Sequence, residues 1–319
     1  MKSNKIYLAP MEGVLDPLVR HLLTQINNYD LCITEFLRVT DTLLPKKSFY
    51  KICPELQSYG KTSSGTPVRI QLLGQSPIFL ALNAYRALEL GSHGIDLNCG
   101  CPSRFVNGHG GGAVLLKSPE TIYQAVLAIA SAIKDMPNNQ FSVKIRLGWD
   151  DSTPTHEIVD AIESAGADMI FVHGRTKEDG YQADKIKWNK IKEIREQTCL
   201  QVVANGEIWS LQSAIECMYA TGCSDLMIGR GALALPNIAN VIKHNEKPML
   251  FEDVIKLLIN YFALEKEQDI KKQYHMMRTK QWLRYILIQY PEALELYQDI
   301  RSVKSNQTIL DRIKQEITF

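Results

Sequence analysis

The sequence predicts an α/β fold, a (β/α)8 barrel of the TIM type followed by an all-α helical bundle, and two observations support this prediction. Eight short apolar, β-branched runs recur up to residue 231, with segments of helical periodicity between them. Strands that alternate with helices pair in parallel, and eight such units in roughly 230 residues match the roughly 250 residues that this barrel usually occupies. After about residue 240 the strand pattern stops, and residues 251–319 show only helical patterns.

The expected strands are each five to seven residues long and end in polar or glycine-rich sequence. They are IYLAP (6–10), DLCITEF (30–36), VRIQLLG (68–74), GIDLNCG (94–100), FSVKIRL (141–147), DMIFVHG (168–174), LQVVANG (200–206) and DLMIGRG (225–231). A doubly wound open sheet is the alternative for such a pattern. That fold usually has a G-x-G-x-x-G turn after its first strand, and APMEGVLD (9–16) is not such a turn.

The helices between the strands have recognisable ends. In the first expected helix, Asp16 is suited to the N-cap and Pro17 to the first helical position. Three later helices are followed by Gly91, Gly166 and Gly222, each a few residues before a strand. Glycine at this place predicts a helix C-cap, because it adopts the left-handed backbone conformation without a steric penalty.

The C-terminal part of the chain is expected to form a second, smaller domain. Its helical segments are FEDVIKLLINYFALEKE, QYHMMRTKQWLRYILIQ, PEALELYQDI and SNQTILDRIKQEI. We therefore divide the chain into a barrel domain, residues 1–240, and a helical domain, residues 241–319.

Composition excludes some classes of protein. The chain has 319 residues and 36 Lys and Arg against 35 Asp and Glu, so a globally basic nucleic-acid binder is not indicated, although a local basic patch is still allowed. The N-terminus lacks a signal peptide's apolar region, and no run of 18 apolar residues occurs, so we expect no membrane segment. Seven scattered cysteines fit a reducing cytoplasm. A monomer is the simplest expectation.

Polar residues gather where the expected strands end, and this is where barrels of this kind place their chemistry. Any one of these residues alone is equally well explained as a capping or solvated residue. The repetition of the pattern at nearly every strand favours a functional site. The residues are Pro10, Met11, Glu12, Glu35, Gln71, Asn98 to Cys101, Lys144, Arg146, His173, Arg175, Asn205, Gly206, Glu207, Gly229 and Arg230.

Two features of these strand ends predict binding of a phosphorylated, redox-active ligand. The last two strands end in ANGE (204–207) and IGRG (228–231), and the loops after strands 7 and 8 commonly bind phosphate in this fold. On their own, these are ordinary turn sequences. Lys144 lies inside a strand, where it either points outward or places a cation against the N1/C2=O edge of a flavin.

The stretch DLNCGCPSRFVNGHGGGAVLL (96–116) has two cysteines before a glycine-rich loop. A lone C-x-C is poor for zinc, which usually takes four ligands, and we expect no metal site. The loop also lacks the lysine of a Walker motif. Cys101 remains as a thiol that a flexible loop brings to a ligand, whereas Cys99 is expected to pack in the core. A buried, inert cysteine is the alternative for Cys101. A thiol is a suitable proton donor near neutral pH.

Taken together, these motifs resemble those of the tRNA-dihydrouridine synthases, flavoenzymes that reduce uridine in the tRNA D loop. The motifs are APMEGV, QLLGQ, LNCGCPSRFVNGHGGGAVLL, VKIRLGWD, VHGRT, VANGEI and MIGRGAL, in the family's order and over residues 6 to 235. The stretches RTKQWL and HGRTKEDGY are similar to the bacterial C-type subfamily, which the resemblance ties to uridine 16. The helical C-terminal region resembles the family's tRNA-binding domain.

The resemblance implies a reaction with FMN as cofactor and NADPH as reductant. Cys101 would protonate C5 of the uracil, and the flavin N5 would deliver hydride to C6. Asn98 would touch the flipped base. The resemblance assigns the flavin contacts to Pro10, Met11, Glu12, Gln71, Lys144 and His173, the ribityl-phosphate end to Asn205, Gly206, Glu207, Gly229 and Arg230, and tRNA contacts to Glu35, Tyr181, Arg278, Lys280 and Tyr285.

A possible RNA-binding face is visible in the residues themselves. Residues 270–291 include several basic residues, among them Lys271 and Lys272, with no acid between Ile270 and Pro291. On a helix, one face would carry Lys271, His275, Arg278, Trp282 and Tyr285. A basic face with aromatic residues suits phosphates and exposed bases. The alternative is a solvated helix face with Trp282 in the core.

Two other functions remain open at this point. One is an FMN-dependent reductase of a small molecule, such as a free pyrimidine or an enone, which would have no use for the basic helical region. The other is an RNA-binding protein with a degenerate barrel, which would bind no flavin. The preference for NADPH over NADH rests on the family resemblance alone.

Overall fold

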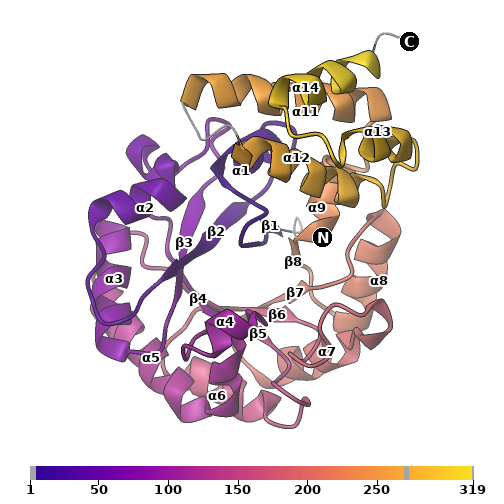
Figure 1. Cartoon of the computed structure of the whole chain (residues 1–319). Helices are drawn as coiled ribbons and strands as arrows, with labels where there is room; N and C mark the ends of the chain where they lie inside the picture. The colour runs from indigo at the N-terminus through magenta and orange to yellow at the C-terminus, as the bar shows by residue number, and fades with distance from the viewer. Residues whose placement is uncertain (1–4, 269–272, 318–319) are drawn as a thin grey trace.

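Eight parallel strands close into a barrel in chain order, so the predicted fold class is confirmed (Figure 1). The computed structural model describes residues 5–268 and 273–317. The strands are β1 (Ile6–Leu8), β2 (Leu31–Arg38), β3 (Val68–Leu73), β4 (Ile95–Cys99), β5 (Phe141–Arg146), β6 (Met169–His173), β7 (Gln201–Asn205) and β8 (Leu226–Ile228). Each overlaps its predicted run, and β1 pairs with β8 to complete the ring.

Helices surround the barrel, as expected for this architecture. They are α1 (Pro17–Gln25), α2 (Lys46–Ile52), α3 (Pro77–Glu89), α5 (Pro119–Ile133), α6 (Thr155–Ser164), α7 (Trp188–Gln197) and α8 (Leu211–Thr221), with the shorter α4 (Arg104–Asn107), α9 (Arg230–Ala234) and α10 (Ile238–His244). The predicted helix ends are confirmed. The Asp16 side chain accepts a hydrogen bond from the backbone N–H of Val19. Gly91, Gly166 and Gly222 all have positive φ angles.

The interior of the barrel has an apolar part and a polar part. Residues two apart on a strand face the same side, and the inner face of β1, β2, β6, β7 and β8 carries a separate apolar cluster that includes Tyr7, Ile33 and Phe171. The inner face of β3, β4 and β5 is polar instead. We call this second set the polar wall; its members are Arg69, Gln71, Asp96, Asn98, Ser142 and Lys144, and hydrogen bonds join most of them to one another.

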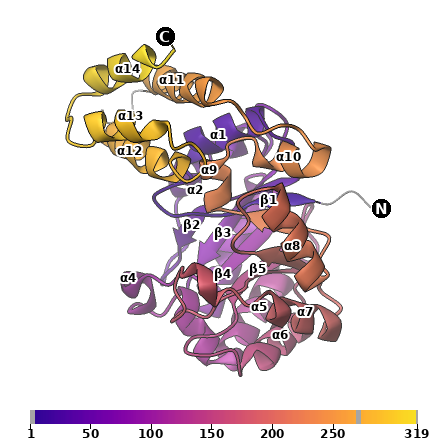
Figure 2. The same cartoon turned by 90° about the vertical axis from the view of Figure 1, so that its right-hand side faces the viewer.

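The described chain after β8 is helical. The helices α11 (Phe251–Gln268), α12 (Gln273–Ile286), α13 (Ala293–Ile300) and α14 (Asn306–Gln315) lie together beside α1 and α9 (Figures 1 and 2). Helix α10 runs across residue 240, and the non-helical segment 245–250 links it to α11. In Figure 2, α12 and α13 lie on the same side of the barrel as α4.

Two general expectations can be compared with the described residues. All seven cysteines lie in the described part of the chain, and none is in a disulfide. Within residues 5–268 and 273–317, no helix has both the length and the apolar character needed to cross a membrane.

Helix α12 docks on the barrel through the face that the sequence suggested would bind RNA. His275, Arg278 and Trp282 are at most 4% exposed, and the Trp282 indole donates a hydrogen bond to the Leu233 carbonyl at 3.1 Å. The expectation of an open basic face at these three positions is therefore wrong. Trp282 lies in the core, as the alternative had it, but the face is not solvated at His275 and Arg278. Lys271 and Lys272 lie outside the described residues. The face is buried because Arg278 has a carboxylate partner, Asp16, on the barrel.

We expect Arg278→Ala to lower the free energy of unfolding by about 3 kcal/mol, because it leaves the Asp16 carboxylate buried without this cation. The Arg278 Nε and Asp16 Oδ2 atoms are 3.2 Å apart, and the two side chains are 4% and 6% exposed. Urea unfolding followed by circular dichroism measures the change. Arg284→Ala is the matched control, because Arg284 is an exposed arginine of the same helix. Equal unfolding free energies for the two variants would contradict the role of the ion pair.

Candidate active site

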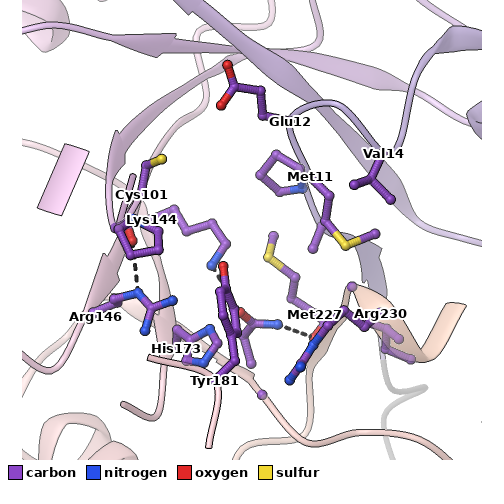
Figure 3. A pocket seen from close by; sticks show the side chains of 18 of the residues that line it. Met11, Glu12, Val14, Cys101, Lys144, Arg146, His173, Tyr181, Met227 and Arg230 are labelled. Carbon is purple, nitrogen blue, oxygen red and sulfur yellow. Dashed lines mark hydrogen bonds between the residues drawn. The ribbon is translucent and has the colours of Figure 1, made fainter. Parts of the chain in front are cut away.

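A cavity of about 560 Å³ opens at the carboxyl ends of the barrel strands (Figure 3). Fifteen of the residues predicted for the site line it, and they come from all strands except β2 and from α12. They are Pro10, Met11, Glu12, Gln71, Asn98, Cys101, Lys144, His173, Tyr181, Asn205, Gly206, Glu207, Gly229, Arg230 and Tyr285. Glu35, Arg278 and Lys280 are not among the lining residues.

Lys144 points into this cavity from the middle of β5. Its Nζ atom donates a hydrogen bond to Asn205 Oδ1 at 2.9 Å, and the Asn205 amide donates onward to the Met227 carbonyl at 2.8 Å. The outward orientation that the sequence left open is therefore not observed. Burial lowers the pKa of Lys144 to about 8, and the nearby Arg146 acts in the same direction while Asp96 opposes it. The ammonium on the cavity wall therefore loses its proton at a lower pH than an ordinary lysine does.

The loop after β4 presents Cys101 to the cavity. Asn98 Oδ1 accepts hydrogen bonds from the backbone N–H groups of Cys101, at 2.9 Å, and Gly100, at 3.1 Å. Gly112 packs so closely that a Cβ atom there would lie 2.9 Å from the Cys101 carbonyl oxygen, and its φ of 72° also favours glycine. Cys99, in contrast, is fully buried in the core. The sequence-based distinction between the two thiols is borne out by their positions.

The thiol of Cys101 remains protonated at neutral pH. Burial is the main cause that raises its pKa, and the carboxylate of Glu12 adds to the effect. A proton donor has to carry its proton at the working pH, so this environment suits an acid and not a nucleophilic thiolate. Figure 3 shows Cys101 and Lys144 on one side of the cavity and Arg230 on the other.

Glu207 organises the opposite side, at the end of β7. Its Oε1 atom accepts from Arg175 at 2.9 Å and from Arg230 at 2.8 Å, and its Oε2 atom accepts from the Trp209 indole at 2.8 Å. The backbone of Glu207 is left-handed, with a φ of 56°, which is uncommon for a residue with a side chain. This strained turn brings the carboxylate between the two guanidinium groups and so fixes the position of Arg230.

His173 and Tyr181 stand between these two sides. Burial and the surrounding cations, beginning with Arg146 and Lys144, hold the pKa of His173 well below its usual range, so the imidazole is neutral at pH 7. Tyr181 is 52% exposed, and its ring lies 5.0 Å from the Arg146 guanidinium and 4.9 Å from that of Arg230. An aromatic ring held between two arginines at the mouth offers a surface for stacking.

Three predicted tRNA contacts do not line the cavity. The Glu35 carboxylate accepts a hydrogen bond from the backbone N–H of Val14 at 3.2 Å, and burial raises its pKa. The Lys280 ammonium donates to the Val303 carbonyl at 2.5 Å within the helical region. Arg278 is paired with Asp16, as described above. The structure thus groups Tyr181 and Tyr285 with the cavity, whereas Glu35 contacts barrel backbone, Lys280 contacts the helical region and Arg278 joins α12 to the barrel.

Sequence reasoning gave no role to Arg146 and did not single out Asp96. Arg146 donates hydrogen bonds to the carbonyls of Gly100, Thr176 and Gly180, each at 2.9 Å, and so ties the loop after β4 to the loop after β6. Its spacing of two residues from Lys144 was an available signal, because both then face the same side of β5. Asp96 is two residues before Asn98 in β4, and its charge within an apolar run was the corresponding signal.

The barrel resembles solved structures whose sequences have diverged widely. Histamine dehydrogenase from Rhizobium sp. 4-9 superposes with a TM-score of 0.57 at 16% identity. The superposition covers 82% of this chain and 49% of the dehydrogenase chain. The structure of TcOYE with pHBA superposes with a TM-score of 0.55 at 11% identity, over 77% of this chain and 90% of that one. At these identities the likeness concerns the fold alone.

Curated relatives match over nearly the whole chain. The tRNA-dihydrouridine(16) synthase of Yersinia pestis is 57% identical over 305 residues, which are 96% of this chain and 97% of the relative. The synthase of Haemophilus influenzae is 54% identical over 98% of this chain and 100% of the relative. That of Escherichia coli K12 is also 54% identical, over 97% of this chain and 98% of the relative.

The family profile described as "Dihydrouridine synthase (Dus)" matches residues 7–318. With this match and relatives of more than half identity over nearly their full length, the chain belongs to the dihydrouridine synthase family.

Proposed function

We propose that this protein reduces the C5–C6 double bond of a uridine in the tRNA D loop, at position 16, to give 5,6-dihydrouridine, with FMN as cofactor and NADPH as reductant. The observation that carries the proposal is that a protonated thiol, Cys101, and an ammonium group, Lys144, face one cavity in a member of this family. The full-length likeness to tRNA-dihydrouridine(16) synthases supports the choice of position. We place the activity in the cytoplasm and assign it to a monomer.

The residues of the cavity fit FMN in size and in chemistry. A volume of about 560 Å³ is in the range of cofactor sites, which is about 300–1,000 Å³. Lys144 supplies a cation for the edge of the ring, where reduction builds up negative charge. On the opposite side, the side-chain-free Gly206 and Gly229 leave backbone accessible beside Arg230, which suits a phosphate. We assign the ring contacts to Pro10, Met11, Glu12, Gln71, Lys144 and His173 and the ribityl-phosphate contacts to Asn205, Gly206, Glu207, Gly229 and Arg230.

Reduction of uracil requires a hydride at C6 and a proton at C5. FMN, when bound, supplies the hydride from its N5 atom. Cys101 holds the proton at Sγ and donates it to C5. His173, being neutral, can donate one hydrogen bond without adding positive charge, and Asn98 contacts the base. The base must leave its stack to reach the cavity, which favours a flexible loop nucleotide.

The tRNA is proposed to enter between the barrel mouth and the helical domain of residues 241–319, which we infer to be the tRNA-recognition domain. Tyr285 of α12 and Tyr181 both line the cavity, so the helical region forms part of its wall. Aromatic side chains at this place suit stacking on an extruded base or its neighbours. Glu35 and Lys280 are retained as proposed tRNA contacts beside the cavity, whereas Arg278, buried in its ion pair with Asp16, is not.

The rate at which NADPH reduces the bound flavin is expected to fall as the pH rises through about 8. Burial has lowered the pKa of Lys144 to about 8, so its cation is lost in this range, far below the usual value for lysine. Cys101 does not cause the fall, because burial raises its pKa. Stopped-flow absorbance without tRNA measures the rate, and Cys101→Ala should show the same pH dependence. A rate that stays constant up to about pH 10, near the usual lysine pKa, would contradict this assignment.

The proposed function is tested with the purified protein and two substrates. Flavin absorbance after purification, or after loading with FMN, is expected, and unmodified tRNA should be reduced whereas free uridine should not. Equal reduction of free uridine or an enone would favour a small-molecule reductase. A protein that cannot be loaded with FMN but binds tRNA would favour an RNA-binding protein.

A further inference from the structure

Asp96 lies at the centre of the polar wall and has no part in the chemistry proposed above. It is fully buried and does not line the cavity. Its Oδ1 atom accepts a hydrogen bond from the Ser142 hydroxyl at 2.6 Å, and that hydroxyl in turn accepts from Arg69 at 2.9 Å. Burying a carboxylate costs free energy, and hydrogen bonds to its oxygens offset only part of that cost. A buried Asp96 outside the chemistry is therefore a candidate for a structural role.

The second oxygen of Asp96 begins a chain of side-chain amides that ends at the Cys101 loop. Asp96 Oδ2 accepts from Gln71 Nε2 at 2.6 Å, and Gln71 Oε1 accepts from Asn98 Nδ2 at 2.8 Å. Asn98 Oδ1 then accepts from the backbone N–H of Cys101 at 2.9 Å and of Gly100 at 3.1 Å. We call the side chains of Asp96, Gln71 and Asn98 the amide relay.

The direction of the amide relay is set at Asp96. An ionised carboxylate only accepts hydrogen bonds, so the Gln71 amide must turn its nitrogen toward Asp96 and its oxygen toward Asn98. Asn98 then has to donate to Gln71, which leaves its oxygen for the loop. If Gln71 were reversed, its carbonyl would face the carboxylate and its amide nitrogen would face that of Asn98, and buried mismatches of this kind are costly.

We propose that Asp96 is a positioning residue that orients the Cys101 loop through the side-chain amides of Gln71 and Asn98. An oriented loop would hold the Cys101 thiol in place for proton transfer. This consequence rests on the proposed function, because it requires Cys101 to be the acid. The orientation of the loop does not depend on that function and can be measured without flavin reduction or RNA.

The test reverses the amide relay by isosteric substitutions in the full-length protein. In Asn98→Asp, Gln71 lies between two carboxylates, at positions 96 and 98. Its amide nitrogen can donate to only one of them, and its carbonyl oxygen then faces the other. Asp96 is fully buried whereas position 98 is 8% exposed at the cavity edge, so the carboxylate introduced at position 98 is expected to turn away and release the loop N–H groups. In the double variant Asp96→Asn, Asn98→Asp, the new amide at position 96 can donate to Gln71, which can then reverse and donate to the new carboxylate at position 98.

The readouts are hydrogen–deuterium exchange of peptides covering residues 99–112 and the rate of iodoacetamide alkylation at Cys101. Asn98→Asp should speed exchange at Gly100 and Cys101 about tenfold, the effect of losing one hydrogen bond of ordinary strength. The double variant should return both readouts to the wild-type range, although it carries the same charge at position 98. Thermal unfolding of each variant shows that it is folded.

Two single variants make the rescue specific. Ser142→Ala removes a bond to the other oxygen of Asp96, outside the relay, and should leave loop exchange unchanged. Asp96→Asn alone should not slow exchange below that of the wild type. Exchange in the double variant as fast as in Asn98→Asp, or no change in Asn98→Asp itself, would overturn the proposal. Rescue of the loop together with an active Cys101→Ala protein would keep the relay and reject the proposed acid.

Discussion

Replacing Cys101 with alanine is expected to lower dihydrouridine formation by at least about 100-fold, the contribution typical of a positioned general acid. The thiol faces the cavity, and burial raises its pKa so that it carries a proton at neutral pH. Flavin content and tRNA affinity should stay unchanged, because the change removes one sulfur atom at the cavity wall. Single-turnover assays with the flavin already reduced isolate the step in which the proton is used.

Cys99→Ala is the matched control for this variant. Cys99 is two residues earlier in the chain but is fully buried in the core, so its loss should affect stability and not the chemical step. Undiminished dihydrouridine yield from Cys101→Ala would remove the acid role from this residue. A similar loss of yield in both variants would point to the fold of the loop and not to the thiol.

Replacing Lys144 with methionine should slow reduction of the bound flavin by about 100-fold or more, comparable to the loss of one preorganised donor at a site of developing charge. Methionine keeps much of the volume but removes the cation. The variant should also lose the decline in rate near pH 8, because the group whose pKa is about 8 has been removed from that wall. Stopped-flow absorbance measures the reduction, and titration with a redox dye measures the expected fall in flavin potential.

Lys117→Met is the control for a general effect of removing a lysine. Lys117 is an exposed residue at the end of the Cys101 loop, with its ammonium 4.1 Å from the ring centroid of Trp149, and its loss should leave flavin reduction unchanged. If Lys144→Met reduces flavin at the wild-type rate and keeps the pH dependence, the ammonium does not act on the cofactor.

The barrel and most of the cavity wall were predictable because both follow from local sequence patterns. Strand periodicity located all eight strands, and the polar residues that follow them meet at one end because parallel strands in a barrel share their direction. Lys144 illustrates the limit of this reasoning. Its place in β5 was evident, whereas its inward orientation depended on a partner, Asn205, that lies 61 residues away.

The orientation of α12 was not predictable from the helix alone. The spacing of His275, Arg278 and Trp282 correctly placed them on one face, but a basic residue on a face usually indicates solvent. Arg278 is buried because it pairs with Asp16. The two residues are 262 positions apart in the sequence, and no local pattern encodes such a pairing. The amide relay was missed for a related reason, since it joins side chains of two strands in addition to the loop.

The central claim is tested most directly by mass mapping of dihydrouridine in tRNA from a strain in which this gene is deleted and then restored. We expect uridine 16 of the D loop to be unmodified in the deletion strain, to be reduced again when the gene is restored, and to stay unmodified when Cys101→Ala is restored instead. Dihydrouridine at position 16 in the deletion strain, or full restoration by Cys101→Ala, would contradict it.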